Sequence, residues 1–151
     1  MVRILFICHG NICRSPMAEY EMRRLVQEAG LQDKITIASA ATSTEELGRP
    51  VYPPAKRLLA ARGIDCSEKR ARQISRQDYT KFVLLIGMDD RNLRYMRQIF
   101  GGDPEGKFRL LMDYTDRPGP VSDPWYTGDF DSAWQDVQDG CWGLLQAITE
   151  K

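Results

Sequence analysis

The apolar positions of the chain follow two alternating patterns, which predict strands separated by helices. Short apolar runs predict the strands, and the most continuous run, KFVLLIGM, is typical of a strand buried on both faces of a parallel sheet. The predicted strands are Met1–Ile7, Ile35–Ser39, Lys81–Met88 and Phe108–Met112. Because helical patterns lie between them, we expect an α/β fold, a three-layer α/β/α arrangement with a mainly parallel central sheet, formed as a single domain by residues 1–151.

Apolar residues spaced three and four positions apart predict the helices. These run from Ser15 to Gly30, from Pro53 to Gly63, from Asp89 to Gly101 and from Phe130 to Ile148. In the first helix, Ser15 is the expected N-cap and Pro16 the first helical residue, because both are favoured there. Ligands of such sheets bind beyond the carboxyl ends of the strands. The loop after the first predicted strand, CHGNICRS, occupies that place.

The charges of the chain are balanced, with 21 Lys and Arg residues against 21 Asp and Glu residues. This balance argues against a nucleic-acid binder, so any anion must be recognised locally. No run approaches the roughly 20 apolar residues that span a bilayer, and the N-terminal apolar run is too short for a signal peptide. We therefore expect a cytoplasmic protein without a membrane span, whose four cysteines are mostly thiols. A monomer is assumed.

The residues of CHGNICRS, Cys8 to Ser15, are suited to holding a phosphate between a strand end and a helix N-terminus. Successive backbone N–H groups curl toward one point there, and the helix dipole adds partial positive charge. Gly10 permits an unusual backbone turn, Asn11 tolerates a left-handed φ, and Arg14 adds a fork of donors that matches two phosphate oxygens. The predicted phosphate-binding residues are His9, Gly10, Asn11, Ile12, Cys13, Arg14 and Ser15.

Cys8 stands at the mouth of this loop and is the predicted nucleophile. Helix N-termini and neighbouring cations lower the pKa of cysteine thiols, so the field that binds a dianion also favours a thiolate. Ser15 is a supporting residue whose hydroxyl is placed to donate to the sulfur. Zinc ligation by Cys8, His9 and Cys13 is disfavoured, because structural zinc sites usually have four ligands and the chain has no second cysteine pair. No metal or other cofactor is expected.

Several motifs together carry a resemblance to a known family. The C-x5-R-S loop is joined by Cys13 within it, by SAATS after the second predicted strand, by RARQI at Arg70–Ile74 and by DPWYTGDF at Asp123–Phe130. In this combination and order, over nearly the whole chain, the sequence resembles the low-molecular-weight protein tyrosine phosphatases. The resemblance implies a metal-independent enzyme that hydrolyses phosphotyrosine in protein substrates through a covalent phosphocysteine on Cys8, with Arg14 as a catalytic residue.

The long aperiodic stretch before Phe130 is expected to supply the proton donor and the substrate pocket. Phosphate-ester cleavage needs an acid for the departing oxygen, and the resemblance assigns this role to Asp123, which would next act as base for the attacking water. Plain Asp-Pro turn chemistry is the other interpretation. Trp125 and Tyr126 are expected to hold a phenyl ring beside the phosphate, which favours phosphotyrosine. For Trp125, a position in the core is the alternative.

Cys13 has two interpretations. The family resemblance implies a reversible disulfide with Cys8, which would protect the nucleophile from irreversible oxidation. A small buried thiol is the alternative, since spacing alone does not show that two sulfurs meet. The redox role is therefore a hypothesis that the sequence leaves open.

Other residues are expected around the loop. The resemblance implies that Ser39 hydrogen-bonds Asn11 and supports it, and His9 is expected at the pocket rim, where its titration would tune substrate binding. The chain departs from the family at Lys69, where many members have histidine, and at Glu45, where many have an aromatic wall residue. An acidic rim at Glu45 is expected to disfavour acidic phosphopeptides and to tolerate basic ones.

Three alternative functions remain open at the level of sequence. A protein arginine phosphatase of the same fold would resemble CTGNTCRS, whereas this chain has Ile12 where such enzymes have threonine. An arsenate reductase would need a further cysteine pair, and no cysteine lies between Cys66 and Cys141. A non-catalytic phosphate-binding module would not require Cys8, Arg14 and Asp123 together. Phosphotyrosine hydrolysis is the leading hypothesis.

Overall fold

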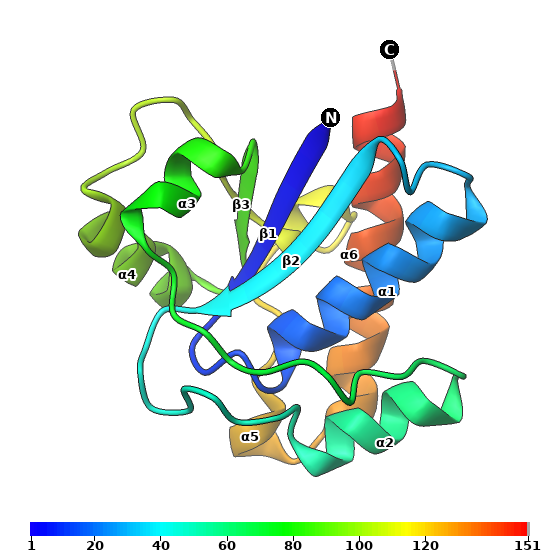
Figure 1. Ribbon diagram of the computed structural model, residues 1–151. Coiled ribbons are helices and arrows are strands. Elements are labelled where there is room, and N and C mark those ends of the chain that lie inside the picture. Colours follow the sequence, from blue (N-terminus) through cyan, green and yellow to red (C-terminus); the bar gives the residue numbers. More distant parts are fainter. Residues whose placement is uncertain (151) are drawn as a thin grey trace.

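A four-stranded parallel sheet forms the centre of the protein in a computed structural model that describes residues 1–150 (Figure 1). Its strands, in the spatial order β2-β1-β3-β4, are β1 (Val2–Cys8), β2 (Ile35–Ala41), β3 (Leu84–Gly87) and β4 (Phe108–Leu110). Every neighbouring pair is parallel, so the carboxyl ends of the strands meet at one end of the sheet. The predicted α/β fold is confirmed.

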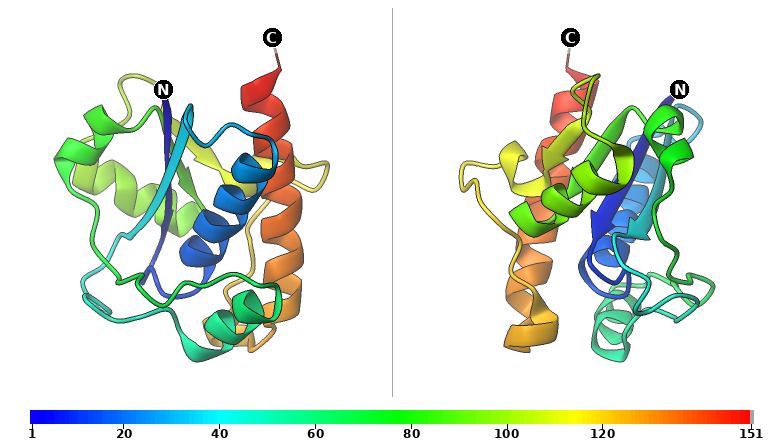
Figure 2. Two further views of the ribbon diagram at one scale, coloured as in Figure 1. Left: turned by 45° about the vertical axis from the view of Figure 1, so that its right-hand side comes forward. Right: turned by 90° about the vertical axis from the view of Figure 1, so that its left-hand side faces the viewer.

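Helices cover both faces of the sheet and complete the three layers (Figures 1 and 2). One face is covered by α1 (Arg14–Glu28) and α6 (Phe130–Thr149), the other by α3 (Arg76–Lys81) and α4 (Asp90–Phe100). Two further helices, α2 (Pro53–Ala61) and α5 (Pro124–Thr127), lie beyond the carboxyl ends of the strands. Among residues 1–150, no helix is long and apolar enough to cross a membrane.

The central strand β1 shows why the sheet is buried on both faces. Side chains alternate across a strand, so Ile4 and Phe6 enter the core cluster shared with α1 and α6. Leu5 and Ile7 enter the opposite cluster, which includes residues of α3 and α4. All four are fully buried. The strand therefore holds Cys8, its last residue, in a fixed position at the end of the sheet.

The N-terminus of α1 differs from the sequence prediction in its cap. The helix begins at Arg14, with Cys13 as the N-cap residue, so Ser15 is not the N-cap and Pro16 is not the first helical residue. The physical reason lies in the partners of the Ser15 hydroxyl, which are the Cys8 sulfur and the Asn11 amide rather than a backbone N–H of the first turn. Ser15 therefore lies in the first turn of α1, and its hydroxyl serves the phosphate-loop residues Cys8 and Asn11.

Two predicted strands are shorter than expected, and short helices replace the missing parts. β3 starts at 84 because Lys81 ends α3, whose first turn is stabilised by Asp78 accepting the Ser75 N–H at 2.8 Å. β4 ends at 110, where a 3-10 helix (Leu111–Tyr114) begins. Similarly, α5 forms within the predicted loop before Phe130. Helices of four to six residues are too short to produce a recognisable helical period.

A close approach between α6 and the 3-10 helix gives a stability prediction. A Cβ added at Gly143 would lie 1.9 Å from the backbone oxygen of Tyr114. Although alanine favours a helix by about 1 kcal/mol over glycine, we expect Gly143→Ala to lower the free energy of unfolding by about 3 kcal/mol, because the two backbones must separate. Urea denaturation measures this change.

A matched control for this substitution is Gln146→Ala, at an exposed position of the same helix. We expect it to change the free energy of unfolding by less than about 0.5 kcal/mol. Equal stability of the two variants would contradict the close approach at Gly143.

Candidate active site

The loop of residues 8–15 joins β1 to α1 and makes its reversal at Asn11. Asn11 has a φ of 61°, and asparagine is among the few residues that tolerate this left-handed conformation. The unusual turn expected at Gly10 is absent there, since its φ is not positive. The missing side chain of Gly10 instead leaves room for Glu46, whose Cγ would lie 3.3 Å from an added Cβ. Glycine serves close packing at this position.

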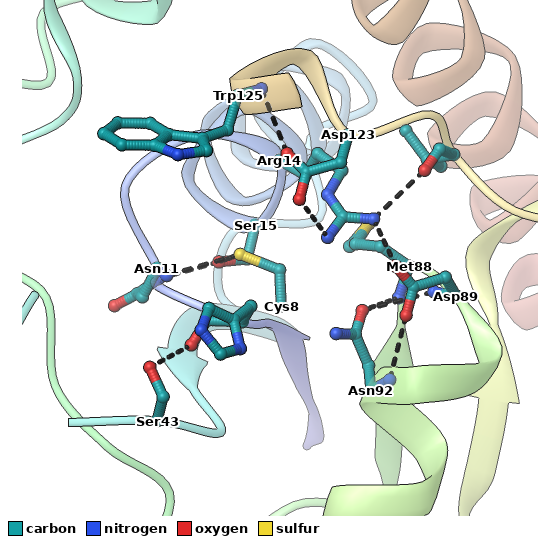
Figure 3. Close-up of polar contacts among 12 residues, drawn as sticks. Cys8, Asn11, Arg14, Ser15, Ser43, Met88, Asp89, Asn92, Asp123 and Trp125 are labelled. Carbon is teal, nitrogen blue, oxygen red and sulfur yellow. Dashed lines mark hydrogen bonds and ion pairs between the residues drawn. The ribbon is translucent and has the colours of Figure 1, made fainter. Parts of the chain in front are cut away.

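Cys8 is the last residue of β1, and two polar groups lie close to its sulfur (Figure 3). Its Sγ is 3.0 Å from the Ser15 hydroxyl and accepts the Asn11 N–H at 3.3 Å. The side chain is almost fully buried. The Asn11 N–H is a donor to the sulfur, whereas the Ser15 hydroxyl can either donate to the sulfur or accept from it.

Asn11 ties the loop to two other segments of the chain. Its amide donates to the Ser15 hydroxyl at 2.8 Å and to the Ser39 hydroxyl at 2.9 Å, and its side-chain oxygen accepts the Arg72 N–H at 3.2 Å. The contact that the resemblance implied between Ser39 and Asn11 is therefore present. Since all side-chain polar atoms of Asn11 have partners, the left-handed turn is held from three sides.

Behind Ser39 lies a buried charge pair that the sequence did not reveal. The Ser39 hydroxyl donates to Glu19 of α1, and Lys69 contacts both Glu19, at 3.3 Å, and the Ser39 carbonyl, at 2.8 Å. Burial lowers the pKa of Lys69, and the neighbouring Glu19 opposes this effect. Lys69, noted as a departure from the family, therefore supports the strand that carries Ser39. The role of Glu19 could have been suspected from the sequence, because an acidic residue on the buried side of a helix needs a partner.

Arg14 is held between two carboxylates (Figure 3). One terminal nitrogen donates to Asp89 at 2.8 Å and to the Val121 carbonyl at 3.0 Å, and the other donates to Asp123 at 3.3 Å. Burial opposes the charge of the guanidinium, yet the nearby Cys8 and carboxylates raise the pKa of Arg14 above its ordinary value. The side chain is thus a fixed, permanent cation at the loop.

Asp89 and Asp123 are each placed by a helix that they cap. Asp89 accepts the Asn92 N–H at 2.9 Å at the start of α4, and Asp123 accepts the Trp125 N–H at 3.1 Å at the start of α5. In each case the second carboxylate oxygen contacts Arg14. From the sequence, Asp89 was predicted only as the start of a helix, because its contact with Arg14 spans 75 positions.

Most of the predicted site residues line a cavity of about 110 Å³ at the loop. Its lining comprises Cys8, His9, Gly10, Ile12, Cys13, Arg14, Glu45, Glu46, Asp123, Trp125 and Tyr126. Of these, Glu46 was not predicted. Asn11, Ser15 and Ser39 are fully buried and do not line the cavity. The sulfur of Cys8, the guanidinium of Arg14 and the carboxylate of Asp123 therefore belong to residues that line the same cavity.

Aromatic and charged side chains form the walls of the cavity. Trp125 is 50% exposed and packs on Tyr52 with ring centroids 4.8 Å apart, so it is not a core residue. Tyr126 is 74% exposed and also lines the cavity. The Nε2 atom of His9 contacts the Glu45 carboxylate, and the His9 carbonyl accepts the Ser43 hydroxyl. These contacts place His9 and Glu45 at the rim.

Cys13 is a buried thiol in the same cavity. Burial, with a contribution from Cys8, raises the pKa of Cys13 well above its ordinary value. All four cysteines are free thiols in this structure. The environment of Cys13 therefore favours its neutral thiol.

The fold and the site together define the class of the protein, an α/β phosphatase with a cysteine in its anion-binding loop. A family model described as low molecular weight phosphotyrosine protein phosphatase matches residues 3–151. The chain belongs to this family. The resemblance inferred from the sequence motifs is thereby confirmed, and so is the leading functional hypothesis, an enzyme of the protein tyrosine phosphatase class.

Named relatives and solved structures agree with this assignment. The low molecular weight protein-tyrosine-phosphatase YfkJ of Bacillus subtilis is 37% identical over 153 residues, which cover 100% of this chain and 98% of the relative. The low molecular weight phosphotyrosine protein phosphatase of Rattus norvegicus is 36% identical, covering 98% and 94%. The crystal structure of YfkJ has a TM-score of 0.94 at 37% identity and covers 98% of this chain and 94% of that chain.

A similar structure with a different named activity is the crystal structure of a Drosophila arginine phosphatase. It has a TM-score of 0.88 at 29% identity, covering 98% of each chain. The fold thus occurs with more than one phosphoryl substrate, so the choice of substrate depends on the residues of the cavity.

Proposed function

We propose that the protein hydrolyses phosphotyrosine in proteins through a phosphocysteine formed on Cys8. The observation that carries the proposal is the convergence of the Cys8 sulfur, the Arg14 guanidinium and the Asp123 carboxylate on one cavity. Nucleophile, phosphate ligand and proton donor are the three groups that the reaction requires. Each is held by contacts that do not depend on the substrate.

Arg14 retains donors for the phosphoryl group. Contacts with Asp89 and Val121 occupy one terminal nitrogen, and Asp123 takes one hydrogen of the other. The Nε–H and the second hydrogen of Nη2 have no acceptor among residues 1–150. A guanidinium with two donors left over suits two phosphate oxygens, and the backbone N–H groups of residues 9–15 supply the remaining contacts in this proposal.

The reaction follows from this arrangement in two steps. The Cys8 thiolate attacks phosphorus, the S–P bond forms as the P–O bond to the phenol breaks, and Asp123 gives its proton to the departing oxygen. Water then attacks phosphorus, Asp123 takes a proton from it, and the S–P bond breaks to release phosphate. The Ser15 hydroxyl, 3.0 Å from the sulfur, stabilises the thiolate that leaves in this second step.

Trp125 and Tyr126 favour an aryl phosphate over a shorter phosphoserine. Both are exposed and line the cavity, so their rings are available to flank a phenyl group. The similarity to an arginine phosphatase keeps phosphoarginine as the second candidate substrate. Ile12, a buried apolar residue in the cavity lining, favours the tyrosine substrate in this proposal.

The test is hydrolysis in EDTA under reducing conditions at mildly acidic pH. We expect the wild-type protein to turn over p-nitrophenyl phosphate and a phosphotyrosine peptide, with kcat/KM for a phosphoarginine peptide roughly fivefold lower, since the ring walls contribute on the order of 1 kcal/mol. Adding zinc after the chelator is the control, and we expect no gain. An inert protein would contradict the proposal, and preference for phosphoarginine would replace it with the second candidate.

We also propose a redox role for Cys13 and a cytoplasmic, monomeric protein. Cys8 and Cys13 are buried free thiols that line one cavity, which supports a protective disulfide between them on oxidation. The four unpaired thiols suit a reducing compartment. Phosphorylated proteins are the substrates of this family, and the acidic residue Glu45 at the rim favours basic residues near the phosphotyrosine.

A further inference from the structure

We infer that a basic groove beside the catalytic cavity binds an acidic residue of the phosphorylated substrate, close to its phosphotyrosine. The inference rests on the proposed function and specifies its substrate class. The groove, called here the α2 groove, is a hollow of about 490 Å³. It is formed by residues 49–53, the first turn of α2, and Trp125.

The α2 groove lies next to the catalytic cavity. Ile12, Glu46 and Trp125 line both hollows, so the two share a wall. The shared wall is held in place by Tyr52, whose ring packs on Trp125. A peptide whose phosphotyrosine enters the cavity therefore has its neighbouring residues beside the groove, because successive residues of an extended chain advance only about 3.3–3.6 Å.

The charges of the groove select the chemistry of the occupant. Lys56 and Arg57 are exposed on its rim and form no ion pair within residues 1–150, whereas Arg49 is paired with Glu46 at 3.1 Å. Beneath them the lining is apolar and includes the buried residue Val51. Two unpaired cations beside an apolar floor attract a carboxylate and accommodate its methylene stem. An aspartate or glutamate of the substrate fits this surface.

The position of the groove refines the expected effect of the acidic rim. His9 and Glu45 line the catalytic cavity but not the α2 groove. An acidic residue near Glu45 is disfavoured, whereas one that reaches Lys56 and Arg57 is favoured. The enzyme should therefore respond to the side of the phosphotyrosine on which an acidic residue stands, and not to the net charge of the peptide.

Three phosphotyrosine peptides test this inference: one with neutral flanks, one with glutamates only on the N-terminal side and one with glutamates only on the C-terminal side. We expect kcat/KM for one of the two acidic peptides to exceed the neutral peptide by about three- to tenfold at low salt, and less at high salt. The double variant Lys56→Glu/Arg57→Glu should lose this preference and still hydrolyse p-nitrophenyl phosphate like the wild type. Lys56→Gln/Arg57→Gln provides the milder variant if charge reversal disturbs folding.

The matched control is Lys34→Glu, an exposed lysine immediately before β2, at the opposite end of the sheet. It makes the same charge change as either single reversal, and we expect it to keep the preference. Absence of a preference in the wild type, or its survival in the Gln double variant, would overturn the inference. Binding of the three peptides to the Cys8→Ser protein, measured by calorimetry, tests the groove without turnover. A wild type inert toward every aryl phosphate would instead refute the proposed function.

Discussion

Replacing Cys8 with serine is expected to lower the hydrolysis of aryl phosphates by roughly 10⁴-fold or more, as for removal of other enzyme nucleophiles. A serine hydroxyl is not ionised at neutral pH, and the contacts from Ser15 and Asn11 that stabilise a thiolate are too weak to ionise it. The measurement is release of p-nitrophenol by equal amounts of folded protein.

The same variant separates catalysis from binding. Because the guanidinium of Arg14 and the loop backbone are unchanged, we expect Cys8→Ser to bind inorganic phosphate with an affinity close to that of the wild type. Cys66→Ser is the matched control, since Cys66 is also a buried thiol but lies outside the cavity. Hydrolysis by Cys8→Ser at more than a few per cent of the wild-type rate would contradict a nucleophilic role. So would an equal loss in Cys66→Ser.

The sequence predicted those parts of the site that are contiguous. Cys8, Arg14 and Ser15 lie within eight positions, so the strand before them and the helix after them place them together. Asp123 came from the family resemblance, because nothing local distinguishes its Asp-Pro from an ordinary turn. The structure adds the reason for its position, an N-cap of α5 whose second oxygen faces Arg14.

The residues that sequence reasoning missed act across long separations. Asp89 has a sufficient local explanation as the cap of α4, and its contact with Arg14 appears only when β1 and β3 lie side by side. Glu19 is one charged residue on a helix with many, and its burial depends on Ser39 and Lys69 from other segments. A residue with one evident local role gives no sequence signal for a second, distant one.

The errors in the predicted boundaries of the helices and strands have a similar physical origin. The long apolar run ending at Met88 was predicted as one strand, but its first residue belongs to α3, whose capping by Asp78 is a local polar contact. Hydrophobic pattern identifies what is buried, whereas caps and turns decide where elements end. The parallel sheet and the helical layers followed from the alternation of patterns, whereas the strand order came from the structure and the element boundaries were only partly predicted.

Asp123→Asn is expected to slow hydrolysis by an amount that depends on the leaving group. For a phosphotyrosine peptide, whose phenolate needs a proton as it departs, we expect a loss of roughly 10²- to 10⁴-fold. For p-nitrophenyl phosphate the loss should be much smaller, since nitrophenolate leaves without full protonation. Asparagine keeps a side-chain oxygen for the Trp125 N–H, so α5 is expected to stay capped.

Comparing the two substrates distinguishes proton donation from a structural role. If Asp123 served only to position Arg14, which it contacts at 3.3 Å, its loss would weaken phosphate binding equally for both substrates. Asp129→Asn is the matched control, because Asp129 caps α6 by accepting the Ser132 N–H at 3.0 Å and does not line the cavity. We expect that variant to hydrolyse both substrates at wild-type rates. Equal slowing of the two substrates by Asp123→Asn would assign the proton to another group.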